Sequence, residues 1–145
     1  MKHEWQQGEF VISTDPARLD VEVIHNFLAH ESYWAQGRTK ELVERAIENS
    51  LVFGIYKGAQ QVGFSRVVTD RATFAWLCDV FVLEPFRGLG LSKWMMEVVT
   101  SHPELQGLRR WLLGTRDAQE LYRKYGFTEL NGEAIWMQRF NELAQ

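Results

Sequence analysis

Residues 79–92 read DVFVLEPFRGLGLS, and this stretch decides the fold. An apolar run and a proline bend lead to glycines at positions 88 and 90, and apolar residues then recur at helical spacing: Leu91, Trp94, Met95, Val98 and Val99. The pattern predicts a strand that enters a helix through a glycine turn. Backbone N–H groups are bare at such a helix start, where the helix dipole favours negative charge, and Arg87 adds a cation. We therefore predict an anion-binding turn with phosphate as the expected anion; the alternative is a plain tight turn.

The composition narrows the class of protein. The chain has 145 residues, 46% of them hydrophobic and only three of them proline, which predicts one folded domain over residues 1–145. A net charge of −3 gives no basic field, so we expect no nucleic-acid partner. No apolar run reaches membrane-spanning length and no signal-peptide pattern is present, so we expect a cytoplasmic protein without a membrane partner. The single cysteine, Cys78, argues against disulfides and cysteine-based zinc sites, and we expect no metal.

Hydrophobic periodicity and turn residues divide the rest of the chain into short elements. Helices are predicted near residues 19–29, after Thr39, and from Asp117 to a left-handed cap at Gly126. Strands are predicted at 10–12, 51–56, 61–68, 73–83, 110–113 and 134–140, with 127–130 as a further candidate. Hairpins come early and crossover helices come late, which indicates a mixed α+β domain.

Two motifs together resemble the GNAT superfamily of acyl-CoA-dependent N-acyltransferases. The first is Arg87-Gly88-Leu89-Gly90-Leu91-Ser92, which is similar to the coenzyme-binding signature of that family. The second is AQELYRKYGF at residues 118–127, which resembles a family helix carrying Leu-Tyr before Gly-Phe. The resemblance covers nearly the whole chain and implies an α/β/α layered fold with a mixed, mostly antiparallel central sheet and splayed strands. Two positions depart from the family pattern, because Ser92 replaces Gly or Ala and Thr115 replaces an Asn.

The resemblance implies that acetyl-CoA is the co-substrate. Its pyrophosphate is expected on the glycine turn, and its pantetheine arm along the edge of the preceding strand, hydrogen-bonded like an added strand. An N–H group of Phe81 or Val82 is then placed to polarise the thioester carbonyl. An ordinary central strand is the alternative. The implied coenzyme-binding residues are Phe81, Val82, Leu83, Arg87, Gly88, Leu89, Gly90, Leu91, Ser92, Thr115 and Tyr122.

Two side chains are candidates for catalytic proton transfer. Tyr122 is the proton donor by its position in the family motif, because a phenol with a pKa near ~10 can protonate the departing thiolate. The alternative is a core tyrosine, since Tyr122 lies on the apolar face of its helix. Asp79, inside an apolar strand near the expected thioester, is the candidate general base, acting directly or through water. The alternatives for Asp79 are a structural hydrogen-bonding carboxylate or a contact with the substrate ammonium, and the family often lacks a direct base.

The acceptor side is expected around the first two helices and the loop between them, which line the acceptor pocket in this family. Rings there suit an apolar or cationic group and a guanidinium suits a carboxylate, so the candidates are Phe27, Tyr33, Trp34 and Arg38. We expect direct transfer, within a ternary complex, to the primary amine of a small molecule such as an amino acid or related metabolite. Acetylation of a protein N-terminus or lysine, a non-catalytic acyl-CoA-binding domain and a homodimer all stay open.

Overall fold

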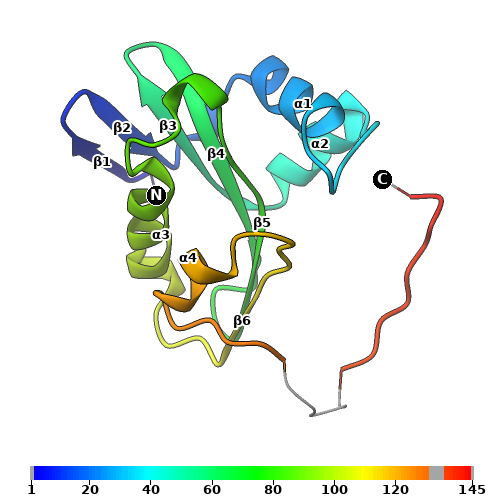
Figure 1. The fold of residues 1–145 in the computed structure, drawn as a ribbon. Coiled ribbons are helices and arrows are strands. Elements are labelled where there is room, and N and C mark those ends of the chain that lie inside the picture. Colours follow the sequence, from blue (N-terminus) through cyan, green and yellow to red (C-terminus); the bar gives the residue numbers. More distant parts are fainter. Residues whose placement is uncertain (1, 131–135, 145) are drawn as a thin grey trace.

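A single sheet forms the centre of the molecule (Figure 1). The computed structural model describes residues 2–130 and 136–144. Within them, six strands lie in sequence order: β1 (Glu4–Gln7), β2 (Phe10–Ser13), β3 (Leu51–Lys57), β4 (Gln60–Thr69), β5 (Phe74–Val82) and β6 (Arg110–Leu112). Neighbouring strands from β1 to β5 pair antiparallel, whereas β5 and β6 run parallel. The predicted mixed, mostly antiparallel sheet is confirmed.

Helices cover both faces of this sheet (Figure 1). They are α1 (Val21–His30), α2 (Lys40–Glu48), α3 (Leu91–Ser101) and α4 (Gln119–Arg123). Asp20 and Thr39 begin α1 and α2, because their side-chain oxygens accept bonds from N–H groups of the first turns. Among the described residues, none of the helices is long and apolar enough to span a membrane.

Each face of the sheet carries its own apolar core. On one face, α1 and α2 pack against the strands through Ile24, Phe27, Leu28, Val43, Ile47, Val52, Phe64 and Phe81. On the other face, α3 packs through Leu91, Trp94, Met95, Val98, Val99, Phe53, Ile55 and Leu77. Successive residues of a strand point to opposite faces, so Val52 and Phe53 are both buried and belong to different cores. The implied α/β/α layering is therefore confirmed.

β5 and β6 separate soon after they meet. They pair over three residues each, from Phe74 opposite Arg110 to Trp76 opposite Leu112. In the described parts of the chain, residues 77–82 of β5 have no strand partner on this side. The splay that the family resemblance implied is thus present, and it exposes the strand edge that leads into the glycine turn.

The first strand was not predicted from the sequence. β1 contains one apolar residue, Trp5, and three exposed polar residues, because it is an edge strand with little core to face. Its pairing with β2 is set by a tight turn in which Gly8 has a φ of 60°, a conformation that glycine adopts without strain. Gly8 was therefore the sequence signal for this hairpin.

The predicted strand at 134–140 is not found in its described part. Residues 134 and 135 lie outside the described residues, and 136–140 form no strand. The apolar side chains Trp136, Met137 and Phe140 are largely exposed, so their alternation faces no packed layer. The candidate strand at 127–130 is likewise absent. The helix predicted from Asp117 begins two residues later, at Gln119.

Candidate active site

The glycine turn has the backbone conformation that an anion site requires. Gly88 and Gly90 have φ values of 80° and 78°, in the left-handed region, and a Cβ built on either would touch nothing within 4 Å. Their need for glycine is therefore conformational. Gly90 begins α3 without a side-chain cap, and the first helical bond joins Trp94 N–H to the Gly90 carbonyl. The preceding N–H groups, at Leu91, Ser92 and Lys93, are left for an outside acceptor.

The free edge of β5 presents the backbone of Val82. Leu83 N–H donates to the Val62 carbonyl on the β4 side, at 2.8 Å. Because backbone groups alternate along a strand, the N–H and carbonyl of Val82 point to the opposite, unpaired edge. The Nε of Arg87 donates to that Val82 carbonyl at 2.9 Å, which fits this orientation. Of the two N–H groups considered from the sequence, Val82 is therefore the one directed into the splay.

Tyr122 stands on α4 beside the splay. Its ring is 8% exposed and packs edge-on against Phe127, with 6.0 Å between ring centroids. Burial raises the pKa of Tyr122 to about 12, with smaller contributions from Tyr33 and Asp117. The phenol is therefore protonated across the neutral range. α4 is held against α3 by the Tyr125 hydroxyl, which donates to the Lys93 carbonyl in the first turn of α3 at 3.1 Å.

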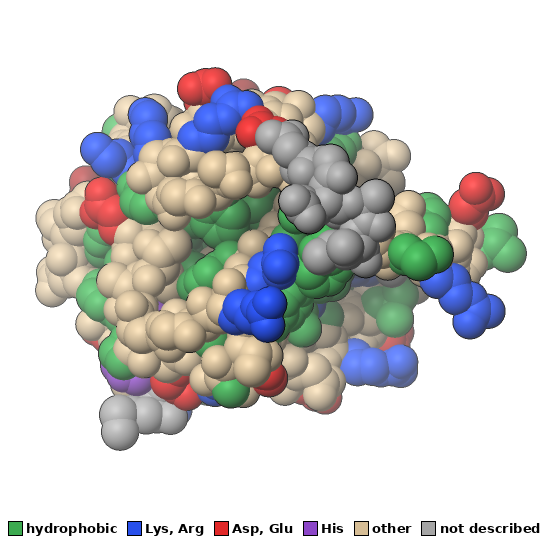
Figure 2. Space-filling model, turned by 90° about the horizontal axis from the view of Figure 1, so that it is seen from below, with side chains coloured by type: hydrophobic (Ala, Val, Ile, Leu, Met, Phe, Trp, Pro, Cys, Tyr) green, Lys and Arg blue, Asp and Glu red, His purple; other side chains and the backbone are tan. Residues whose placement is uncertain are grey.

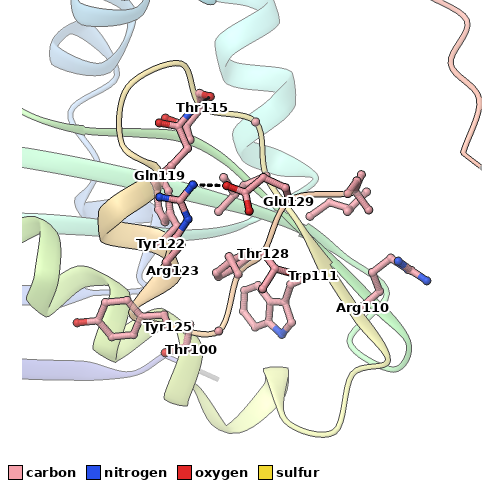
Figure 3. A pocket seen from close by; sticks show the side chains of 16 residues that line it. Thr100, Arg110, Trp111, Thr115, Gln119, Tyr122, Arg123, Tyr125, Thr128 and Glu129 are labelled. Atoms are coloured by element: carbon pink, nitrogen blue, oxygen red, sulfur yellow. Dashed lines mark hydrogen bonds and ion pairs between the residues drawn. The ribbon is translucent and has the colours of Figure 1, made fainter. Parts of the chain in front are cut away.

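A cavity of about 660 Å³ opens beside β6 and α4 (Figure 3). Thr115 and Tyr122 line it together with Trp111 and the segment from Tyr125 to Leu130. Thr100, near the end of α3, also lines it, whereas the glycine turn lies at the start of α3, about 15 Å away along the helix. This cavity therefore contains two of the predicted coenzyme residues but not the glycine turn that is predicted to bind an anion. From below, the molecule is hollowed and hydrophobic side chains show in the hollow (Figure 2).

Asp79 is the centre of a buried ion-pair network. A bulge between β4 and β5 gives Asp79 a φ of 54°, unusual for a residue other than glycine, and its side chain is 4% exposed. Its carboxylate accepts bonds from Trp34 Nε1 at 2.9 Å, from Arg38 Nη1 at 3.1 and 3.2 Å, and from Arg66 Nε at 2.8 Å. Of the roles left open from the sequence, this geometry favours the structural carboxylate.

The rings predicted for the acceptor side contact one another in series. Phe81 of β5 stacks on Phe27 of α1, with ring centroids 4.1 Å apart, and Trp34 follows at 6.3 Å from Phe27. Tyr33 meets Trp34 edge-on at 5.0 Å. A second pocket, of about 550 Å³, lies between α1 and Leu83, Glu84 and Pro85 at the end of β5. The rings and this pocket both lie beside α1 and the Phe81–Leu83 segment.

Tyr33 also links the loop between α1 and α2 to the segment between β6 and α4. Its hydroxyl accepts a bond from Arg116 N–H at 2.8 Å, and the Arg116 guanidinium lies 3.9 Å from the centre of its ring. These residues are 83 positions apart. No local sequence pattern could have paired them.

The structure thus brings the predicted acceptor residues Phe27, Trp34 and Arg38 together around Asp79 and Phe81. Arg66 was missed from the sequence. Its signal was a charge inside the apolar β4 run, because buried charges are normally paired, and Asp79 is the matching charge in β5.

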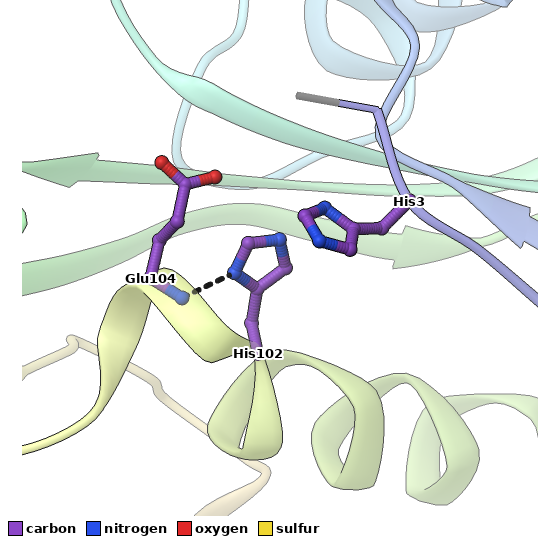
Figure 4. A group of neighbouring side chains, drawn as sticks. All are labelled: His3, His102 and Glu104. Atoms are coloured by element: carbon purple, nitrogen blue, oxygen red, sulfur yellow. Dashed lines mark hydrogen bonds between the residues drawn. The ribbon is translucent and has the colours of Figure 1, made fainter.

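A separate cluster contains His3, His102 and Glu104 (Figure 4). His102 is fully buried, and its Nδ1 accepts a bond from Glu104 N–H at 3.0 Å. The ring proton therefore lies on Nε2, which has no partner among the described residues and is a donor, not a metal ligand. The Glu104 carboxylate is ion-paired with Arg71 at 3.0 Å. His102 therefore caps the short helical turn that follows it, and the cluster does not have the hydrogen bonding of a metal centre.

Comparisons with known proteins agree with this site. A family model described as an acetyltransferase (GNAT) domain matches residues 48–129. A Gibberella zeae protein named provisionally as an acetyltransferase is 32% identical over 142 residues, covering 83% of this chain and 79% of that protein. A crystal structure from Xanthomonas campestris, provisionally assigned to the GNAT acetyltransferases, is 46% identical, covers 94% of this chain and 96% of that one, and has a TM-score of 0.90.

A more distant GNAT acetyltransferase from Elizabethkingia anophelis, 17% identical, shares the fold, with a TM-score of 0.63 over 84% of this chain and 78% of that one. The splayed sheet, the glycine turn and these matches define an acetyltransferase. The chain belongs to the GNAT family.

Proposed function

We propose that this protein is an N-acetyltransferase that moves the acetyl group of acetyl-CoA to the primary amine of a small molecule. The observation that carries the proposal is the splayed β5 edge running directly into a left-handed glycine turn with bare N–H groups. A pyrophosphate fits that turn, and an extended arm fits the unpaired edge. The Elizabethkingia anophelis relative of the same fold has acetyl-CoA bound, which supports the choice of donor.

In this proposal Val82 N–H binds the thioester carbonyl oxygen and stabilises the negative charge that develops there. The neutral amine attacks the carbonyl carbon directly in a ternary complex, so that a C–N bond forms and the C–S bond breaks. Tyr122 donates its phenolic proton to the departing thiolate, which is possible because burial keeps the phenol protonated, with a pKa of about 12. The proton lost from the amine leaves through water, and water returns a proton to the Tyr122 phenolate, so the phenol is restored for the next turnover.

Asp79 has a positioning role in this scheme and is not the base. Its carboxylate oxygens are engaged by Trp34, Arg38 and Arg66, so it holds the loop between α1 and α2 against β5. A direct general base needs a lone pair facing the amine. Proton removal by water does not depend on such a group.

The test is thiol release from acetyl-CoA across a panel of small amines, with mass spectrometry of the acceptor. The proposal expects amine-dependent release and an acceptor heavier by one acetyl group. Tyr122→Phe should lower this release. Its matched control is Tyr125→Phe, which removes the hydroxyl of a nearby tyrosine that bonds to α3. Tight coenzyme binding without turnover on any amine would contradict the proposal and support a binding module instead.

A further inference from the structure

Two arginines share one carboxylate on the acceptor side. The side chains of Arg38, Arg66 and Asp79 are 15%, 11% and 4% exposed. Asp79 is the only acidic group within ion-pair distance of either guanidinium among the residues that the structure describes. The adjacent Cys78 thiol adds no charge, because burial raises its pKa to about 12. The network therefore carries one net positive charge in a largely desolvated place, where an additional anion is stabilised.

The hydrogen bonds of Arg38 leave one complete edge of its guanidinium available. Both of its bonds to Asp79 come from Nη1. Its Nε and Nη2 have no hydrogen-bond partner in the described ranges 2–130 and 136–144, and neither atom is fully buried without a partner. These two N–H groups lie in the guanidinium plane along one edge and form the fork that binds a carboxylate or phosphate in a bidentate way.

The fork is held in place before any ligand arrives. Asp79 fixes the guanidinium, and the His25 imidazole Nε2 donates to the Arg38 carbonyl at 3.0 Å. Arg38 N–H in turn donates to the Ala35 carbonyl. Arg66, whose Nη1 donates to Ser50 Oγ, supplies a second positive charge behind the same carboxylate. A preorganised fork loses little freedom on binding.

We propose that the free edge of Arg38, backed by Arg66, binds an anionic group of the acetyl acceptor. This inference rests on the proposed N-acetyltransferase function and names its substrate class, a small amine that carries a carboxylate or a phosphate. Asp79 stands two residues before Phe81 on β5, about 7 Å along the strand. The anion is thus bound near the segment that holds the thioester, and the body of the acceptor lies along the exposed ring of Trp34, which Phe27 supports from below.

The experiment compares matched pairs of acceptors in the thiol-release assay. Glycine, β-alanine and 4-aminobutanoate are each compared with their carboxamides, and phosphoethanolamine is compared with ethanolamine. The expected result is that at least one anionic member has a kcat/KM at least tenfold above its neutral partner. The series of amino acids shows the spacing between amine and carboxylate, and the phosphoethanolamine pair separates phosphate from carboxylate recognition.

Arg38→Gln is the diagnostic variant, and Arg45→Gln is its control, since it removes the same charge from an exposed position of α2. Arg38→Gln should raise KM for the preferred anionic acceptor at least tenfold and change KM for the neutral partner little. Arg38→Lys keeps the charge but loses the fork and should restore less than half of the lost kcat/KM. Arg45→Gln should behave as the wild type. Melting temperatures of all variants separate folding loss from binding loss.

The failure of this inference differs from the failure of the proposed function. If neutral partners react as well as anionic ones, or if Arg38→Gln lowers both equally, the anion site is overturned while N-acetylation stands. If no amine is acetylated, the proposed function fails. The anion site is then tested by the rise in melting temperature that the same acids produce when CoA is present. A rise that Arg38→Gln abolishes supports the anion site, and the absence of a rise overturns it.

Discussion

Replacing Asp79 with Asn tests whether this carboxylate holds the two arginines or serves as a base. Asn keeps the shape of the side chain and tolerates a φ of 54°, so the change removes charge without backbone strain. Two guanidinium groups would then remain largely buried without a counter-charge. Removing one partner of a buried ion pair costs about 3–5 kcal/mol. Because both arginines keep some solvent contact, we expect the lower end, about 3 kcal/mol.

For a domain of this length, about 3 kcal/mol corresponds to a fall in melting temperature of about 10 °C. The assay is urea unfolding and thermal melting of Asp79→Asn beside Asp117→Asn, an exposed aspartate whose loss should cost less than about 0.5 kcal/mol. A variant that melts within about 2 °C of the wild type, yet loses the acidic limb of its pH–rate profile, where a general base becomes protonated, would refute the structural role. It would restore Asp79 as the general base.

Three further predictions follow from other parts of the structure. Tyr122→Phe should lower kcat at least about 100-fold with an almost unchanged KM for acetyl-CoA, and an unchanged kcat where chemistry limits the rate would exclude it as the acid. Gly90→Ala forces a residue with a Cβ into the left-handed region, which should lower the free energy of unfolding by about 1–2 kcal/mol and weaken CoA binding about tenfold in calorimetry. Gly107 has a φ of 73° and lies far from the turn, so Gly107→Ala should lose similar stability and bind CoA normally. Burial lowers the pKa of His102 below 6.5, so the folded state takes up fewer protons than the unfolded state as pH falls below about 6.5. Stability should then fall by up to about 1.4 kcal/mol per pH unit, and His102→Asn, which keeps an acceptor for Glu104 N–H, should show a shallower slope in urea unfolding at pH 5–7; equal slopes would contradict this.

The elements that face a core were predictable, and so was the glycine turn. The apolar residues from Leu91 to Val99 recur at helical spacing because α3 buries one face on the sheet. The turn needs positive φ values at positions 88 and 90, and glycine adopts them without strain. β1 was not predictable from periodicity, because an exposed edge strand needs few apolar residues.

The site was predictable one residue at a time but not as a network. Asp79 was visible as a charge inside an apolar strand, and Arg66 could have been added by the same logic, whereas Arg38 was chosen because its guanidinium lies in the loop expected to line the acceptor pocket. The bulge at Asp79 changes which residues stand opposite one another across β4 and β5, and no local pattern encodes it. The Tyr33–Arg116 contact depends on tertiary packing across the splay, which sequence spacing does not determine.

The structure of the protein with acetyl-CoA bound tests the account most directly. We expect the pyrophosphate on the N–H groups of residues 88–92, the pantetheine arm along β5 beyond Trp76, and the thioester carbonyl within hydrogen-bond distance of Val82 N–H. The Tyr122 hydroxyl should face the sulfur atom. A coenzyme bound instead in the cavity beside Trp111, with the glycine turn free of contacts, would contradict the account.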